Sequence, residues 1–330
     1  MGPRTERLLA LADLTPIDRT VPYSRSVTHE QAPVAVFAYR RPDHLTRCLA
    51  ALRVNPEASA TRLVIFCDGP KSPAEADPVS ETRKVARNAQ GFAKVDVVAS
   101  ESNRGLAKSL IAGVSEVVDE AGEVIVVEDD LVVSEDFVTY MNQGLALYRD
   151  DPRVASIHGF LPKVDRELPQ SFFLRGADCW GWATWKRAWS AFNPDGAALL
   201  AALREHPDRG AFDFNGAYPY LDMLERQVRG EVDSWAIRWY ASAFLADMYT
   251  LHPGVSLVAN SGMEGSGTHS GRLEALEAQA ARFSLPLRRI PVSEDPRGRK
   301  AVAAALGTKS RTWASPIARL LQRLGRGGSE

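Results

Sequence analysis

The chain has 330 residues, of which 45% are hydrophobic and 25% charged, and its formal net charge at pH 7 is −1. This composition is ordinary for a soluble protein, the length allows a full core, and the net charge gives no reason to expect a nucleic acid as partner. No apolar run approaches the ~18 residues of a membrane span. The widely spaced Cys48, Cys67 and Cys179 predict neither a disulfide framework nor a zinc site, so we expect a cytoplasmic protein.

The first half of the chain alternates between short apolar runs and helical patterns. Runs of β-branched and aromatic residues predict buried strands at 34–39, 63–67, 95–98 and 124–127. Helices are predicted after residues 42, 78 and 105. This alternation predicts an α/β fold whose mixed, mainly parallel sheet is flanked by helices and built with right-handed crossovers.

Beyond residue 150 the pattern is looser. It predicts strands at 154–157 and 255–258, helices at 220–228 and 237–248, and a loop at 207–219. An aromatic segment lies between these elements, at 179–185.

Both ends of the chain differ in composition from the middle. Residues 1–31 are polar and punctuated by prolines, which predicts an N-terminal extension to a domain at 32–285. Residues 286–330 form a basic tail, and its apolar residues from 317 to 324 fit a short amphipathic helix. Such a helix either stays solvated or associates weakly with an anionic membrane surface.

Three carboxylates, Glu128, Asp129 and Asp130, directly follow the strand at 124–127. Ligands bind at the carboxyl ends of strands in open α/β sheets, and adjacent carboxylates repel one another unless a cation lies among them. A divalent metal carrying a nucleotide diphosphate is one such cation, since hard cations take oxygen ligands. The alternative is an acidic turn before a helix that Ser134 caps.

An ordered series of short motifs between Pro33 and His269 resembles the GT-A-fold nucleotide-sugar glycosyltransferases. Within that fold it is most similar to the inverting, metal-dependent enzymes related to N-acetylglucosaminyltransferase I and the bacterial family-2-like transferases. The motifs, in chain order, are Phe37-Ala38-Tyr39-Arg40-Arg41-Pro42, Asp68, Asn103-Arg104-Gly105-Leu106-Ala107-Lys108, Glu128-Asp129-Asp130, Trp180-Gly181-Trp182, Val232-Asp233-Ser234-Trp235 and the loop that ends at His269. The resemblance divides the domain into a nucleotide-binding half at 32–133 and an acceptor half at 134–285.

For the nucleoside, the resemblance implies contacts from the end of the first strand and from the end of the second. Tyr39, Arg40 and Arg41 would surround the nucleoside, with Arg40 or Arg41 near the base or the diphosphate. Asp68 would hydrogen-bond the uracil edge. Without the resemblance, the arginines are surface residues in a turn, and Asp68 opens an ordinary turn.

For the diphosphate, the resemblance points to the helix that begins after Asn103. Free N–H groups at a helix N-terminus suit an anion, and Arg104 and Lys108 would add charge-assisted bonds or contact the donor sugar. The alternative is a capped helix start with exposed basic side chains.

For the metal, the resemblance makes Asp130 the ligand of Mn²⁺ or Mg²⁺, with Asp129 and Glu128 beside the sugar and the ribose. The metal would neutralise the charge that develops on the leaving diphosphate. His269 would complete the metal shell, contact the diphosphate or merely pack the loop.

For the acceptor, the resemblance points to Trp180, Gly181 and Trp182, since aromatic faces stack on sugar rings and glycine permits close approach. Asp233 would be the general base that takes the proton of the acceptor hydroxyl, and Glu231 is the competing carboxylate. Asp233 also has the residue type and position of a helix N-cap.

These expectations define a metal-dependent inverting transferase that moves GlcNAc or another hexose from a UDP-sugar to a glycan or small-molecule acceptor. Three alternatives remain open. They are a retaining transferase of the same fold, a sugar-1-phosphate nucleotidyltransferase and a nucleotide-sugar-binding scaffold without catalysis. The nucleotidyltransferase would need a glycine-rich phosphate loop after the first strand, and Tyr39-Arg40-Arg41-Pro42 has no glycine.

Overall fold

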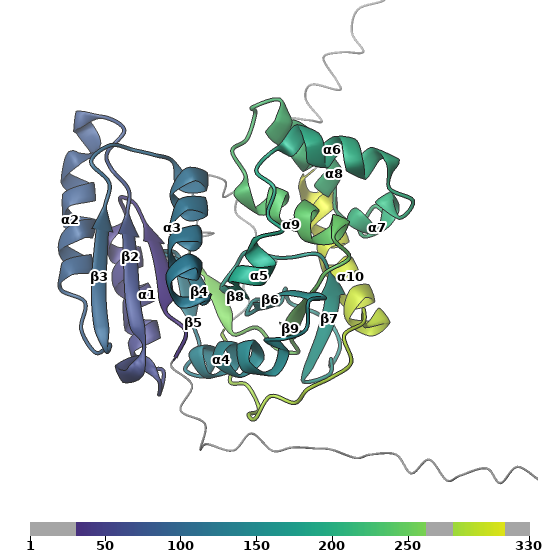
Figure 1. Cartoon of the computed structure of the whole chain (residues 1–330), viewed down its shortest axis with the longest axis horizontal. Coiled ribbons are helices and arrows are strands. Elements are labelled where there is room, and N and C mark those ends of the chain that lie inside the picture. Colours follow the sequence, from purple (N-terminus) through teal and green to yellow (C-terminus); the bar gives the residue numbers. More distant parts are fainter. Residues whose placement is uncertain (1–30, 262–279, 314–330) are drawn as a thin grey trace, which may run out of the picture.

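The computed structural model describes residues 31–261 and 280–313, and their core is an eight-stranded sheet in the order β3-β2-β1-β4-β8-β6-β9-β7 (Figure 1). The strands of this sheet are β1 Val34–Ala38, β2 Arg62–Cys67, β3 Lys94–Ala99, β4 Glu123–Glu128, β6 Val154–His158, β7 Ser171–Arg175, β8 Trp182–Trp185 and β9 Tyr249–Pro253. Parallel pairs outnumber antiparallel pairs, and helices flank the sheet. The predicted fold class is confirmed.

In the first half of the chain, helices alternate with strands along the sequence. In the second half, several helices follow one another between β8 and β9. The helices are α1 Pro42–Arg53, α2 Ala76–Arg87, α3 Leu106–Ala121, α4 Phe137–Tyr148, α5 Lys186–Trp189, α6 Gly196–Glu205, α7 Arg209–Phe212, α8 Tyr220–Val228, α9 Trp235–Leu245 and α10 Pro296–Trp313, with 3-10 turns at η1 Ala58–Ala60 and η2 Pro73–Glu75. A separate two-stranded ladder pairs β5 (Leu131–Val133) with β10 (Val258–Asn260).

The connections of the first four strands create a point where the strand order reverses. From β1 the chain steps outward through α1 and α2 to β3, and α3 then carries it back across to β4. Right-handed crossovers put α1 and α2 on one face and α3 on the other. Figure 1 shows α3 on the side of the sheet that faces α5 and α9, and α3 packs against both helices. The reversal leaves β1 and β4 adjacent.

Four features differ from the sequence-based prediction. Trp182–Trp185, expected only as an aromatic segment, is the central strand β8, and β7 is a strand that no period-2 pattern indicated. The predicted loop at 207–219 contains the short helix α7. Ser134 does not cap α4, because the helix begins at Phe137 and the Ser134 hydroxyl is buried without a hydrogen-bond partner in the described part of the chain.

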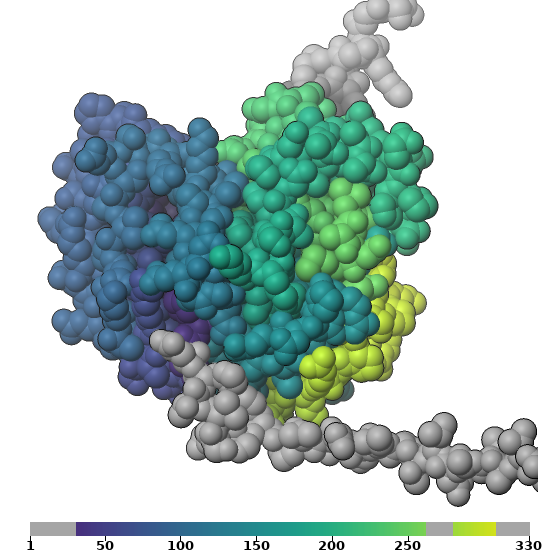
Figure 2. All heavy atoms as spheres, viewed as in Figure 1, coloured from purple at the N-terminus to yellow at the C-terminus, as the bar shows by residue number. Residues whose placement is uncertain are grey.

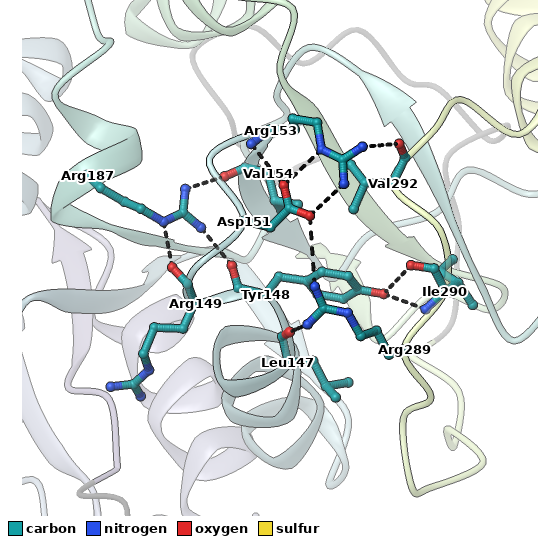
Figure 3. A network of polar contacts seen from close by, with 10 residues as sticks. All are labelled: Leu147, Tyr148, Arg149, Asp151, Arg153, Val154, Arg187, Arg289, Ile290 and Val292. Atoms are coloured by element: carbon teal, nitrogen blue, oxygen red, sulfur yellow. Dashed lines mark hydrogen bonds and ion pairs between the residues drawn. The ribbon is translucent and has the colours of Figure 1, made fainter. Parts of the chain in front are cut away.

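The segment 283–295 runs back along α4 and ties the start of the predicted basic tail to the folded body (Figure 3). Ile290 donates its N–H to the Tyr148 hydroxyl at 2.8 Å, and Arg153 donates to the carbonyl oxygen of Val292 at 3.4 Å. Val292 is buried in the main core. The described residues after 286 are therefore an integral part of the domain, and the predicted amphipathic helix at 317–324 lies outside the described residues.

No helix in the described part of the chain combines the length and the apolar character that crossing a membrane requires. The three cysteines are free thiols, as predicted.

Candidate active site

Residues that follow β1 and β4 meet where the strand order reverses. Arg41 donates from Nη2 to Asp129 Oδ1 at 2.8 Å and to Asp130 Oδ2 at 3.1 Å. The backbone N–H of Tyr39 lies 3.4 Å from Asp129 Oδ2. Crevices at such reversals are the ligand sites of open α/β sheets. The cation among the carboxylates in this structure is thus Arg41 itself.

Burial makes two carboxylates of this site, those of Asp129 and Glu128, hard to ionise. Asp129 is 3% exposed, and burial raises its pKa to about 7 against the opposing charge of Arg41. Burial also raises the pKa of Glu128 to about 8, and the charges of Asp130 and Asp129 add to the shift. Arg41 Nη1 is buried and has no hydrogen-bond partner among the described residues. The site therefore combines shifted acids with a donor that a ligand oxygen can use.

Asp68, which follows β2, positions the loop before α3. Its Oδ1 accepts the N–H groups of Gly69 and Arg104, both at 2.8 Å. Its Oδ2 accepts Asn103 Nδ2 and the N–H of Gly105, both at 3.0 Å. Four donors fill the acceptor capacity of a carboxylate. In this conformation Asp68 has no free lone pair for the uracil edge, and Asn103 supports the loop.

The N-terminus of α3 is open toward the site. Its N-cap residue, Gly105, has φ +81° and provides no side-chain cap to the first turn. A Cβ on Gly105 would lie 3.9 Å from Asp233 Oδ2, so the segment before α9 brings Asp233 to this helix end. Arg104 and Lys108 are exposed beside it. Free N–H groups, two basic side chains and one carboxylate therefore share this place. Figure 2 shows a notch between the two halves of the molecule, next to the end of α3 that β3 leads into.

Asp233 is exposed because its neighbour provides the helix cap. Ser234 is the N-cap of α9, and its hydroxyl accepts the N–H of Ile237 at 3.3 Å. Asp233 therefore does not cap the helix, and its closest ion-pair contact in the described residues is Arg238 at 3.5 Å. The competing carboxylate, Glu231, is paired with Arg229, whose hydrogen bond holds the pKa of Glu231 below its usual range. Among the described residues, Asp233 thus has fewer ion-pair partners than Glu231.

A second polar cluster at the end of β1 includes a residue that the sequence did not indicate. Glu75 accepts the Tyr39 hydroxyl, the N–H of Lys71 at 2.9 Å and Arg40 Nη1 at 2.9 Å. The bond from Tyr39 is the largest cause that holds the pKa of Glu75 below its usual range. Glu75 lies in a polar segment without a motif, so only the fold brings it to Tyr39 and Arg40.

The aromatic motif contributes less to the site than predicted. Trp182 is fully buried in β8 and its ring stacks on Trp235, so the expected stacking of Trp182 on an acceptor is wrong. Gly181 has φ +65°, and a Cβ there would lie 2.8 Å from Val258, so its small size serves internal packing. Trp180 is half-buried and its ring packs edge-on against Phe160 at 4.7 Å. Of the three, only Trp180 reaches solvent.

The acidic residues fit a divalent metal only if a substrate shares it. Among the described residues, no group of three or more His, Cys, Asp or Glu side chains is arranged to hold a metal ion. Mg²⁺ is commonly held by one or two carboxylates together with substrate phosphates, so Asp130 fits a cation shared with a diphosphate. Arg41 would then release Asp130 Oδ2. The predicted ligand His269 lies outside the described residues, and Ser261, before it, donates its N–H to the carbonyl oxygen of Asp130 at 2.8 Å.

No family model matches the sequence, and no curated protein does. Among the solved structures that match, the crystal structure of S. aureus TarS has 18% sequence identity and a TM-score of 0.27. The match covers 44% of this chain and 24% of the TarS chain, so it spans about a quarter of that protein. Because a TM-score this low assigns no family and no activity, the site geometry and the motifs carry the functional case.

Proposed function

We propose that this chain is a metal-dependent, inverting glycosyltransferase that moves a sugar from a UDP-sugar to an acceptor hydroxyl. The observation that carries the proposal is the convergence of distant segments at the strand reversal. Arg41 contacts Asp129 and Asp130, and Asp233 lies at the open N-terminus of α3, which Asp68 positions. The choice of UDP, of GlcNAc or another hexose, and of inversion follows from the resemblance of the motifs.

The donor's diphosphate would lie between the acidic residues and α3. The N–H groups of the first turn of α3, Arg104 and Lys108 would bind its oxygens. Asp130 would hold a divalent cation together with the diphosphate. When bound, such a cation neutralises the charge that develops on the leaving oxygen. Arg41 Nη1, a buried donor without a partner in the described chain, would add a hydrogen bond to the same group.

Asp233 would perform the proton transfer. The acceptor oxygen attacks the anomeric carbon while the bond to the diphosphate breaks, and the bonding electron pair leaves with the nucleoside diphosphate. Asp233 takes the proton of the acceptor hydroxyl as the new glycosidic bond forms on the opposite face of the sugar. The exposure of Asp233, and its position at the end of α3 rather than at the cap of α9, support this role.

The experiment that tests the proposal is calorimetric titration with UDP, GDP and dTDP, first with Mn²⁺ and then with EDTA. We expect tight, Mn²⁺-dependent binding of UDP. Asp130→Ala should abolish the Mn²⁺ dependence, and Asp222→Asn, which removes the same charge from the exposed face of α8, should not. Absence of binding by every nucleotide would overturn the proposal.

Anomeric analysis of the product separates inversion from retention. A product of inverted configuration supports the single displacement with Asp233 as base, and a retained configuration moves the chain to the retaining alternative. Release of pyrophosphate from UTP and a sugar 1-phosphate would instead identify a nucleotidyltransferase.

A further inference from the structure

The guanidinium of Arg41 holds two carboxylates through a single nitrogen. Its Nη2 lies 2.8 Å from Asp129 Oδ1 and 3.1 Å from Asp130 Oδ2. Its Nη1 is buried and has no hydrogen-bond partner among the described residues. A guanidinium is planar and its donors are fixed relative to one another, so an oxygen that binds Nη1 also changes where Nη2 can point. The nitrogen that binds the acids is therefore coupled to a nitrogen that can accept a further ligand.

The two carboxylates that Arg41 contacts are held to different degrees. Asp129 is the more buried, and its Oδ2 also lies 3.4 Å from the backbone N–H of Tyr39. Asp130 is more exposed, and within the described ranges its side chain has no ion-pair partner besides Arg41. Its backbone is fixed, because its carbonyl oxygen accepts both the N–H and the hydroxyl of Ser261, at 2.8 and 2.9 Å. Asp130 therefore has a fixed backbone and a side chain that can exchange its partner.

A divalent cation that arrives alone gains little at this site. It must take Asp130 from Arg41, whose positive charge then repels it from a few ångströms away. The residues that the structure describes offer no group of three or more metal-binding side chains to compensate. One or two carboxylates hold such a cation well only when substrate phosphates complete its ligands. The free protein should therefore bind the cation weakly.

A diphosphate changes this balance in two ways. Its oxygens supply the ligands that the protein lacks, and one of them can accept from Arg41 Nη1, since guanidinium and phosphate form strong charge-assisted bonds. Arg41 can keep its shorter contact with Asp129 while it does so. The negative charge of the diphosphate also reduces the repulsion between the guanidinium and the cation. Asp130 then exchanges Arg41 for the cation at a lower cost.

We propose that Arg41 couples the binding of the cation to the binding of a nucleoside diphosphate. Arg41 occupies Asp130 in the free protein and releases it when a diphosphate oxygen binds Nη1, so the cation binds together with the nucleotide and not before it. The proposal rests on the proposed function and adds to Arg41 a role beyond contact with the donor. Because such coupling is reciprocal, the same residue makes nucleotide binding depend on the cation.

Arg62 provides a matched control for Arg41. Its side chain has the same exposed fraction, 29%, and it also bridges two carboxylates, those of Asp96 and Glu120, each at 2.7 Å. Arg62 is the first residue of β2, which runs parallel to β1, and β1 runs parallel to β4. It therefore lies at the edge of the sheet opposite the acidic site. Arg62→Met removes the same charge and frees two carboxylates away from the diphosphate.

The test is titration of the full chain with Mn²⁺, followed by the electron paramagnetic resonance of free Mn²⁺, without nucleotide and with UDP against a UDP-only blank. Without nucleotide, Arg41→Met should bind Mn²⁺ about 10- to 100-fold more tightly than wild type, the range for a hydrogen bond to a charged group. Arg62→Met should not differ from wild type, and Asp130→Asn added to Arg41→Met should abolish the gain. Arg41→Lys keeps a cation beside the buried Asp129 in case Arg41→Met does not fold, and should show a smaller gain.

The outcomes separate this proposal from the proposed function. If wild type binds UDP with Mn²⁺ but no Arg41 variant gains Mn²⁺ affinity without nucleotide, the coupling role is wrong and the proposed function stands. The same holds if Arg62→Met gains as much as Arg41→Met, or if the gain survives Asp130→Asn, because the effect is then not specific to the acidic site. If wild type does not bind UDP with Mn²⁺, the proposed function fails and the coupling role fails with it.

Discussion

The contact between Arg41 and the acidic residues gives a quantitative prediction. In Arg41→Met the side chain keeps its length but loses its charge, so Asp129 and Asp130 face each other and Glu128 without a cation. Arg40→Met is the matched control, because the neighbouring arginine is 54% exposed and pairs with Glu75 outside this site.

The expected loss of stability in Arg41→Met follows from the burial of Asp129. Asp129 is 3% exposed and cannot regain full hydration when the guanidinium is removed. Removing one partner of a buried ion pair costs about 3–5 kcal/mol. Arg41 keeps 29% of its side chain exposed, so we expect the lower end, about 3 kcal/mol. At roughly 2 °C per kcal/mol for a chain of this size, the Tm should fall by ~6 °C. The exposed pair of Arg40 should contribute no more than ~1 kcal/mol.

The stability that Arg41→Met loses should depend on pH. The folded-state pKa values of Asp129 (about 7) and Glu128 (about 8) exceed the ordinary ~4 of an unfolded carboxyl group. Groups with raised pKa values contribute stability that is complete below pH ~4 and is lost as the pH rises through the folded values. Without Arg41 these carboxylates ionise at a greater cost, so the difference between variant and wild type should be largest at pH 8 and shrink toward pH 5.

Thermal unfolding followed by circular dichroism at pH 8 and pH 5 measures both effects. The reasoning is refuted if Arg41→Met and Arg40→Met lower the Tm equally at pH 8. It is also refuted if the deficit of Arg41→Met is the same at both pH values.

Three other predictions concern separate parts of the molecule. Asp130→Ala should retain the wild-type fold by circular dichroism but lose Mn²⁺-dependent UDP binding in calorimetry; unchanged affinity would remove it as a ligand. Asp233→Asn should bind UDP normally yet turn over ~100- to 10,000-fold more slowly, whereas Glu231→Gln should stay near wild type; the reverse order would move the base to Glu231. His158 and His252 have folded pKa values lowered to about 3, so their stability contribution is complete above pH ~6.5 and is lost as the pH falls toward 3. His252→Gln should therefore lose less stability than wild type between pH 7 and pH 4 in urea titrations, and an identical slope would contradict the buried neutral pair.

The fold of residues 32–133 was predictable because its signals are local. A parallel strand covered by helices on both faces must be apolar along its length, and the runs at 34–38 and 124–127 meet that requirement. The fold of residues 134–285 was less predictable. β8 is antiparallel between β4 and β6, and four residues that include two tryptophans carry no period that distinguishes a strand from an aromatic loop.

The candidate site was also predictable only in its local features. The sequence indicated which polar residues follow the strands, and the structure brings Arg41 to Asp129 and Asp233 to the end of α3. It did not indicate how their hydrogen-bonding capacity is used. Asp68 accepts four N–H groups, three of them from residues 103–105, and that count depends on a loop conformation that no motif encodes.

The carboxylate of Asp233 does not cap a helix, because the neighbouring Ser234 provides the cap. An aspartate directly before a helix is usually a cap, and a cap's oxygen is occupied by a backbone N–H. Here the helix begins one residue later than that arrangement requires, and Ser234 accepts the N–H of Ile237 instead. The hydroxyl of Ser234 thus relieves Asp233 of the capping role, while Arg229 occupies Glu231. Replacing Ser234 with alanine would remove the competing acceptor and let Asp233 turn inward to cap α9. The local capping role and the proposed catalytic role are therefore divided between two adjacent side chains.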